Sequence, residues 1–109
     1  MAFEALDVTL AFLTALAEVD AQIARRDPDL ARQLRRAGSS IALNLAEGRK
    51  RVGRDRLHCF RIAAGSADEV TAALDVALAW AAIGPAQRAA LDAGLDRVRA
   101  MCWRLTHPR

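Results

Sequence analysis

The chain has 109 residues, of which 53% are hydrophobic, with three Pro, no Tyr and a formal net charge of +3. That length suffices for one domain with a real core, and the excess of Ala and Leu favours helix over strand. Glu4 and Asp7 stand where a secretory signal needs positive charge, and the apolar runs are too short for a membrane span. We therefore expect a soluble, cytoplasmic protein that does not contact a membrane.

Helical periodicity predicts four helices in succession, over residues 5–26, 28–48, 54–83 and 85–106. Asp27 is the expected N-cap of the second helix, with Pro28 at its first position. Gly48 stands where a helix C-cap favours a left-handed residue, and Gly84-Pro85 is expected to stop the third helix and start the fourth. Because the connections are short, we predict an all-α, antiparallel up-down-up-down four-helix bundle.

The first and third helices carry more apolar surface than a four-helix monomer can cover. The first is apolar over roughly 220° of its circumference. The third has two stripes, one with Phe60, Val70, Leu74 and Leu78, the other with Ile62, Val76, Trp80 and Ile83. The second and fourth helices have one stripe each: Leu30, Leu34, Ala37, Ile41 and Leu45, then Leu91, Leu95, Val98, Cys102 and Leu105. The excess indicates a protein partner, most simply identical subunits; the alternative is a monomer with broad core helices. Leu43 and Trp103, large apolar groups on polar faces, are further interface candidates.

Basic residues concentrate in the middle of the chain. Residues 25–61 hold eleven Lys or Arg against four Asp or Glu, whereas the remainder holds five against nine. Fifteen of the sixteen basic residues are Arg, whose planar fork suits phosphate or carboxylate. The candidate nucleic-acid ligands are Arg32, Arg35, Arg36, Arg49, Lys50, Arg51, Arg54 and Arg56. No aromatic residue interleaves with them, so the sequence gives little support for base stacking. A structural role at helix ends is the open alternative.

The second helix also carries a polar ladder. Arg36, Ser40, Asn44 and Glu47 recur at helical spacing, so they can bond across a helix pair, and Glu47 can pair with Arg36 of its own or a neighbouring subunit. In the third helix, Gly65 and Ser66 are small enough for close approach to another backbone. Asp68 and Glu69 could then form ion pairs with the arginines. The predicted assembly motif comprises Arg36, Ser40, Leu43, Asn44, Glu47, Gly65, Ser66, Glu69 and Trp80.

Signs of catalysis are weak. His58 and Cys59 are adjacent on a helix and point apart, while Cys102 and His107 lie five residues apart near a chain end. Neither arrangement has zinc-site spacing or a third orienting group. A Gly-rich phosphate loop and a Glu-x-x-His di-iron pattern are also missing from the sequence. We expect no enzyme activity, metal or cofactor.

Two runs of this chain resemble a known family. The first run contains Gln33-Leu34-Arg35-Arg36-Ala37, Ser40-Ile41, Asn44 and Ala46-Glu47-Gly48; the second contains Ala64-Gly65-Ser66 and Glu69. Their order and spacing are similar to those of the 23S rRNA intervening-sequence proteins, which are four-helix bundles. The resemblance implies a homopentameric, barrel-like ring.

That family includes the accessory variability proteins of diversity-generating retroelements, which resemble basic pentamers that bind nucleic acid and a reverse transcriptase. The implied function is a non-enzymatic oligomeric scaffold that binds RNA or DNA through its arginines. Two alternatives stay open. In the first, the protein is an interaction adaptor whose arginines bind an acidic protein. In the second, it is a structural oligomer without a nucleic-acid ligand.

Overall fold

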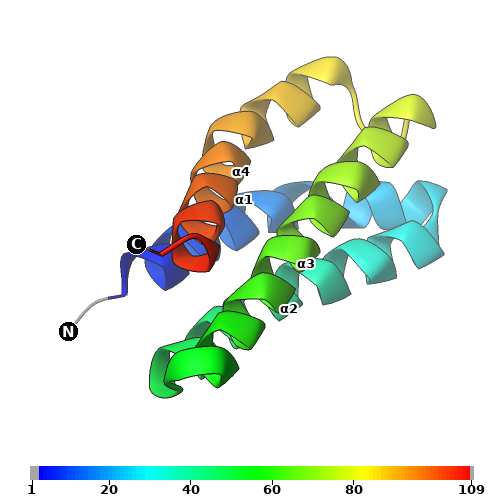
Figure 1. The fold of residues 1–109 in the computed structure, drawn as a ribbon. Coiled ribbons are helices and arrows are strands. Elements are labelled where there is room, and N and C mark those ends of the chain that lie inside the picture. The colour runs from blue at the N-terminus through cyan, green and yellow to red at the C-terminus, as the bar shows by residue number, and fades with distance from the viewer. Residues whose placement is uncertain (1–2, 109) are drawn as a thin grey trace.

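The computed structural model describes residues 3–108, which form four helices and no strand. The helices are α1 (Glu4–Arg26), α2 (Pro28–Lys50), α3 (Gly53–Ala79) and α4 (Pro85–Thr106) (Figure 1). The molecule measures 42 × 23 × 22 Å. Its length is that of α3, since 27 helical residues span about 40 Å at 1.5 Å per residue. Within the described residues, no helix is long and apolar enough to cross a membrane.

The helices pack as a ring of neighbours around one apolar core. The packed pairs are α1 with α2, α2 with α3, α3 with α4, and α4 with α1. All five residues of the predicted α2 stripe are buried, as are the first four of the α4 stripe. The most deeply buried large apolar side chains come from all four helices: Ile23, Leu34, Ile41, Leu45, Val70, Leu74, Leu95 and Val98.

A single residue, Asp27, connects α1 to α2. Its extended backbone (φ −151°, ψ 91°) breaks the helical path, and its Oδ1 accepts a hydrogen bond from the backbone N–H of Leu30 at 3.1 Å. Pro28 then occupies the first position of α2, where its missing N–H costs no hydrogen bond. The predicted cap is therefore present, and the turn is as short as two helices allow.

The end of α2 differs from the prediction. Gly48 lies inside the helix, which continues to Lys50 and stops at Arg51 with extended backbone. The left-handed conformation belongs to Gly53 instead, with φ +59°. Gly48 is required for another reason: a Cβ there would lie 2.7 Å from Cε1 of Phe60. The glycine thus allows α2 and α3 to approach closely.

The third helix also stops earlier than predicted, at Ala79 rather than Ile83. Ala81 has φ 58°, and its N–H donates to the carbonyl of Leu78 at 3.0 Å, while the N–H of Ala82 donates to Ala77 at 2.8 Å. This pair of bonds is the Schellman motif, which normally places glycine in the left-handed position. The chain then leaves the helix axis, so that Ile83 is 2% exposed and joins the core.

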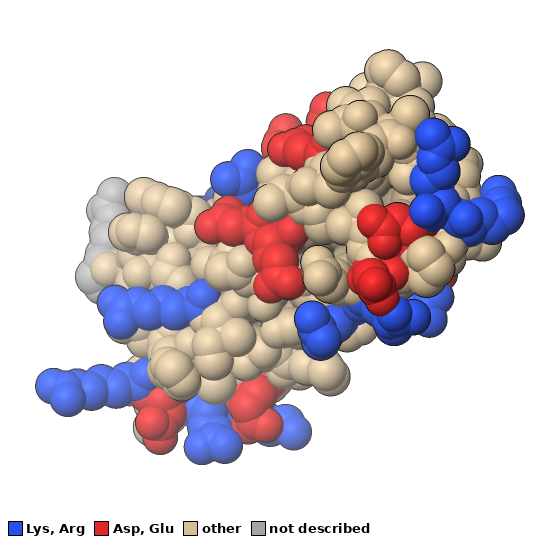
Figure 2. Space-filling model, turned by 90° about the vertical axis from the view of Figure 1, so that its right-hand side faces the viewer, with Lys and Arg blue, Asp and Glu red and all other residues tan. Residues whose placement is uncertain are grey.

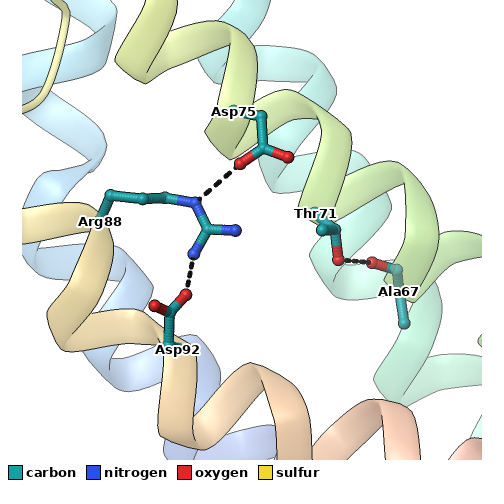
Figure 3. Close-up of polar contacts among 5 residues, drawn as sticks. All are labelled: Ala67, Thr71, Asp75, Arg88 and Asp92. Carbon is teal, nitrogen blue, oxygen red and sulfur yellow. Dashed lines mark hydrogen bonds and ion pairs between the residues drawn. The ribbon is translucent and has the colours of Figure 1, made fainter. Parts of the chain in front are cut away.

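Side-chain hydrogen bonds and ion pairs connect the start of α4 to α3 and α1. Arg88 at the start of α4 donates through Nε to Asp75 Oδ1 of α3 at 3.1 Å and through Nη1 to Asp92 (Figure 3). The Arg88 side chain is only 13% exposed, although both carboxylates are mostly exposed. On the α1 side, Gln22 and Gln87 exchange side-chain hydrogen bonds of 2.7 and 2.9 Å.

Candidate nucleic-acid and assembly surfaces

The two motif runs meet along the seam between α2 and α3. Ser66 Oγ donates to Ser40 Oγ at 2.8 Å. Asn44 Nδ2 donates to the same oxygen at 3.1 Å and to the Ser40 carbonyl at 2.9 Å. Ser66 is buried and the other two are half-buried. These three residues therefore join two helices of one chain.

The charged members of the motif have different partners from those expected. Glu47 Oε2 accepts a hydrogen bond from Arg51 Nε at 3.0 Å, rather than pairing with Arg36 of the same chain. This hydrogen bond raises the pKa of the Arg51 guanidinium. Asp68 pairs with Arg99 of α4 at 3.4 Å, away from the central arginines. Within residues 3–108 no ion pair involves Arg36 or Glu69, so both stay available to a second molecule.

Within the described chain, no backbone packs closely against Gly65. A Cβ added there would meet nothing within 4 Å, and the residue is exposed. The tight contact lies instead at Gly48, against Phe60. Gly65 therefore lies on a free outer surface of α3, where only a further molecule could require its small size.

Large apolar side chains are exposed along the outside of the α2–α3 pair. Leu43 is 68% and Trp80 69% exposed, and Ile62 and Val76 are about 40% exposed. We call these four residues the outer apolar face. Three members come from the second stripe predicted on α3; its fourth, Ile83, is buried because the helix ends before it. On α1, the wide apolar arc leaves Leu10 49% exposed.

The predicted arginine patch is divided into two groups. Arg32, Arg35 and Arg36 lie in the first half of α2. Arg32 pairs with Asp29, and Arg35 pairs with Asp20 of α1. The second group begins at Arg49, about 20 Å further along the helix. Figure 2 shows Lys and Arg side chains gathered at separate places on one face, with Asp and Glu side chains among and between them.

We call the second group, Arg49, Lys50, Arg51, Arg54 and Arg56, the turn cluster, because it surrounds the connection between α2 and α3. Arg49 lies over the Phe3 ring, 5.5 Å from its centroid. Arg56 donates through Nε to the Gly48 carbonyl at 3.2 Å and through Nη2 to the Arg49 carbonyl at 3.1 Å. Arg56 thus satisfies the last carbonyls of α2.

Lys50 and Arg54 complete the turn cluster. Both are exposed, and in the described part of the chain neither has an ion pair. The cluster holds five cationic groups against the single acidic Asp55 within eight residues. Arg56 holds the end of α2, whereas within residues 3–108 Lys50 and Arg54 have no ion pair that a bound phosphate would break.

Reactive groups are few in the described structure. Cys102 is 2% exposed, and burial raises the pKa of its thiol to about 11. At neutral pH its thiol is therefore protonated. Since the thiolate is the nucleophilic form, Cys102 is an unreactive core residue. Across residues 3–108 no three His, Cys, Asp or Glu side chains gather as a metal site.

A profile of the 23S rRNA-intervening sequence protein family matches residues 4–104. This chain belongs to that family. A crystal structure of a protein of unknown function from the S23 ribosomal protein family of Bacteroides thetaiotaomicron is similar in fold, with a TM-score of 0.83 at 18% identity. The likeness covers 95% of this chain and 99% of that one. Among curated proteins no significant match was found.

In this 23S rRNA-intervening sequence protein, some residues of the two motif runs pack inside the chain and others are exposed. Ser40, Asn44 and Ser66 form the internal seam, whereas Leu43 and Gly65 are exposed outside it. Helical spacing alone separated core from surface on α2 and showed the ladder. It could not show that Gly48, rather than Gly65, is the tight position, because that depends on the partner helix.

Arg61 is not among the candidate ligands that the sequence indicated, and the sequence did not place Trp103 near any basic residue. Arg61 is exposed on α3, one turn before Ala64. Ala64 and Trp103 line the same hollow between α3 and α4. Trp103 follows Arg61 by more than 40 residues, so no linear signal joins them.

Proposed function

We propose that this protein is a non-enzymatic, basic homo-oligomer that binds RNA or DNA. The observation that carries the proposal is the turn cluster, in which five cationic groups surround one connection. Among residues 3–108, its Lys50 and Arg54 are exposed and have no ion pair. Guanidinium and ammonium groups bind phosphate without reading sequence. The expected affinity is therefore salt-dependent and largely independent of base sequence.

Binding of a labelled RNA or DNA duplex, measured by fluorescence anisotropy at several salt concentrations, tests this proposal. The double variant Lys50→Gln/Arg54→Gln should weaken binding and flatten the plot of log affinity against log salt by about 2 units of slope, if each group holds one phosphate. The matched control is Arg25→Gln/Arg26→Gln. It removes the same charge at the end of α1, beside the connection to the start of α2 and away from the turn cluster. Equal losses in both variants, or no binding at 50 mM salt, would contradict the assignment.

The oligomeric part of the proposal rests on the outer apolar face. Leu43 and Trp80 are each more than two-thirds exposed and lie with Ile62 and Val76 on one helix pair. Several large exposed apolar side chains on one helix pair are typical of a surface that another protein covers. We propose five copies in a ring, the number that the family resemblance implies, and a reverse transcriptase as the protein partner if the gene lies in a retroelement. Genome neighbourhood decides the latter.

We also propose that neighbouring helices run antiparallel in up-down-up-down order. Gln22, near the end of α1, bonds to Gln87, near the start of α4. Asp75, near the end of α3, pairs with Arg88, also near the start of α4. Such pairs between the end of one helix and the start of its neighbour support the proposed order.

A structural oligomer without a nucleic-acid ligand is the second candidate. Its support is that Arg51 and Arg56 already have partners within the chain, namely Glu47 and the end of α2. On this account the arginines stabilise helix ends. Unchanged assembly together with no affinity for RNA, duplex DNA or heparin at low salt would favour it.

A further inference from the structure

A hollow of about 470 Å³ lies on the surface between α3 and α4, close to the C-terminal end of α4. Ala64 and Asp68 of α3 form one wall, and Arg99 and Trp103 of α4 form the other, with His107 at the end. The hollow therefore combines an indole, a guanidinium and a carboxylate. None of them belongs to the outer apolar face or to the turn cluster.

Trp103 is held in place although it is 60% exposed. The His107 ring stacks on the indole with 4.1 Å between centroids and 14° between planes. His107 is itself fixed by Nδ1, 2.8 Å from the Trp103 carbonyl oxygen, and by its backbone N–H, which donates to Arg104. An imidazole can cover one side of the indole only. The stack therefore orients the ring and leaves much of it accessible.

One arginine lines the hollow with this ring, and others follow along α3. Arg99 lines the hollow, and its pair with Asp68 joins two side chains that are 48% and 70% exposed. Exposed pairs of this kind contribute little and open easily. Arg61 lies three residues before Ala64, so it is a neighbour on the same side of α3. Arg54 of the turn cluster lies roughly 10 Å further toward the start of the same helix. Figure 1 shows the end of α4 beside the first half of α3.

We propose that Trp103 is a stacking platform for one unpaired nucleobase, with Arg99 and Arg61 contacting the phosphates on either side of it. This inference rests on the proposed nucleic-acid function and specifies its ligand as single-stranded. An aromatic face beside arginines is the arrangement by which proteins bind single strands. Bases in a duplex keep their faces stacked on one another, so they cannot use such a platform.

The two tryptophans of the chain provide a direct test. Trp80→Phe leaves Trp103 as the sole indole, and Trp103→Phe leaves Trp80, 69% exposed on the outer apolar face. Each variant is titrated at low salt with a labelled 12-nucleotide single-stranded RNA, while indole fluorescence and label anisotropy are read together. We expect quenching when Trp103 is the sole indole and none when Trp80 is.

Affinity supplies the second readout. Trp103→Ala should weaken single-strand binding by about 5- to 150-fold, the range for loss of one base–aromatic stack, and leave duplex binding unchanged. Trp103→Phe, which keeps an aromatic face at the same position, is the matched control and should retain most of the single-strand affinity. Circular dichroism checks that each variant is folded. Binding with unquenched Trp103 and an unaffected Trp103→Ala variant would overturn the platform but leave the proposed function intact. Absence of binding to any nucleic acid would overturn both.

Discussion

Ala81 occupies a left-handed backbone position, with φ 58°, where most helices place glycine. Because its Cβ approaches the following carbonyl oxygen, alanine is less stable in this conformation by about 1 kcal/mol or more, whereas glycine has no Cβ. Ala81→Gly should therefore raise the free energy of unfolding by up to about 1 kcal/mol. Urea denaturation measures it. The control, Ala72→Gly, lies inside α3 at an exposed position and should lower stability by about 0.5–1 kcal/mol. Destabilisation by Ala81→Gly would show that the Schellman turn is assigned wrongly.

Gly48 and Gly65 form a second matched pair, because both lie inside helices but differ in surroundings. A Cβ at Gly48 would lie 2.7 Å from the Phe60 ring and 3.0 Å from Cβ of Cys59, whereas one at Gly65 meets nothing. Gly48→Ala should cost about 1–3 kcal/mol through overpacking. Gly65→Ala should gain about 0.5–1 kcal/mol through helix propensity. Thermal unfolding of the two variants gives the comparison, and equal effects would contradict the account of the α2–α3 contact.

Cys102 makes stability depend on pH above neutrality. Burial raises the pKa of its thiol to about 11 from the ordinary 9.0, so between these values the unfolded chain releases a proton that the folded chain keeps. Stability should accordingly fall as pH rises from 9 to 11, by up to about 2–3 kcal/mol. The chain has no Tyr and one Lys, so few other side chains titrate there. Urea unfolding at several pH values should show a slope that Cys102→Ala reduces, and an unchanged slope would refute the assignment.

At the scale of the helices, the turn cluster contains residues with opposite tasks. Arg56 donates two hydrogen bonds to the last carbonyls of α2, whereas Arg54 has no ion pair within residues 3–108. Arg56→Gln should lower stability by about 1–2 kcal/mol and loosen the end of α2. Arg54→Gln should change it by less than about 0.5 kcal/mol. Hydrogen exchange at residues 47–51 provides the local readout. Equal protection in both variants would mean that Arg56 does not cap the helix.

Periodicity predicted the helices and their core stripes because those depend on spacing within one segment. It placed Leu34, Ile41 and Leu45 in the core and Leu43 outside, as the structure has them. It failed where a second helix decides the outcome. The partner of Glu47 and the tight contact of Gly48 depend on such geometry. The early end of α3 depends on Ala81, which adopts a left-handed backbone conformation that alanine does not favour.

The same limit applies to the candidate site. Helical spacing already divided the arginines into a group on the second helix and a group at its end, and α2 places Arg36 and Arg49 about 20 Å apart. The sequence showed no aromatic residue among them, because Trp103 comes beside Ala64 only when α4 packs on α3. Charge could be read from the sequence, but the distribution of that charge over the surface needed the fold.

For the whole molecule, the outer apolar face should control assembly. A carboxylate at Trp80 would be buried without a partner if a second copy covers this face, and burial of an unpaired charge is costly. Trp80→Glu should therefore reduce the molecular mass in solution. Ala89→Glu, at an exposed position on α4, is the control and should leave it unchanged. Equal masses for both variants, measured by light scattering, would move the interface elsewhere.

The most direct test of self-association is the mass of the unmodified protein at micromolar concentration, measured by size-exclusion chromatography with light scattering. One chain has a mass of 11.8 kDa. The proposed ring predicts about 59 kDa, five times that value. A stable mass of 11.8 kDa would contradict the account, because the exposed Leu43, Ile62, Val76 and Trp80 would then face water without a partner subunit.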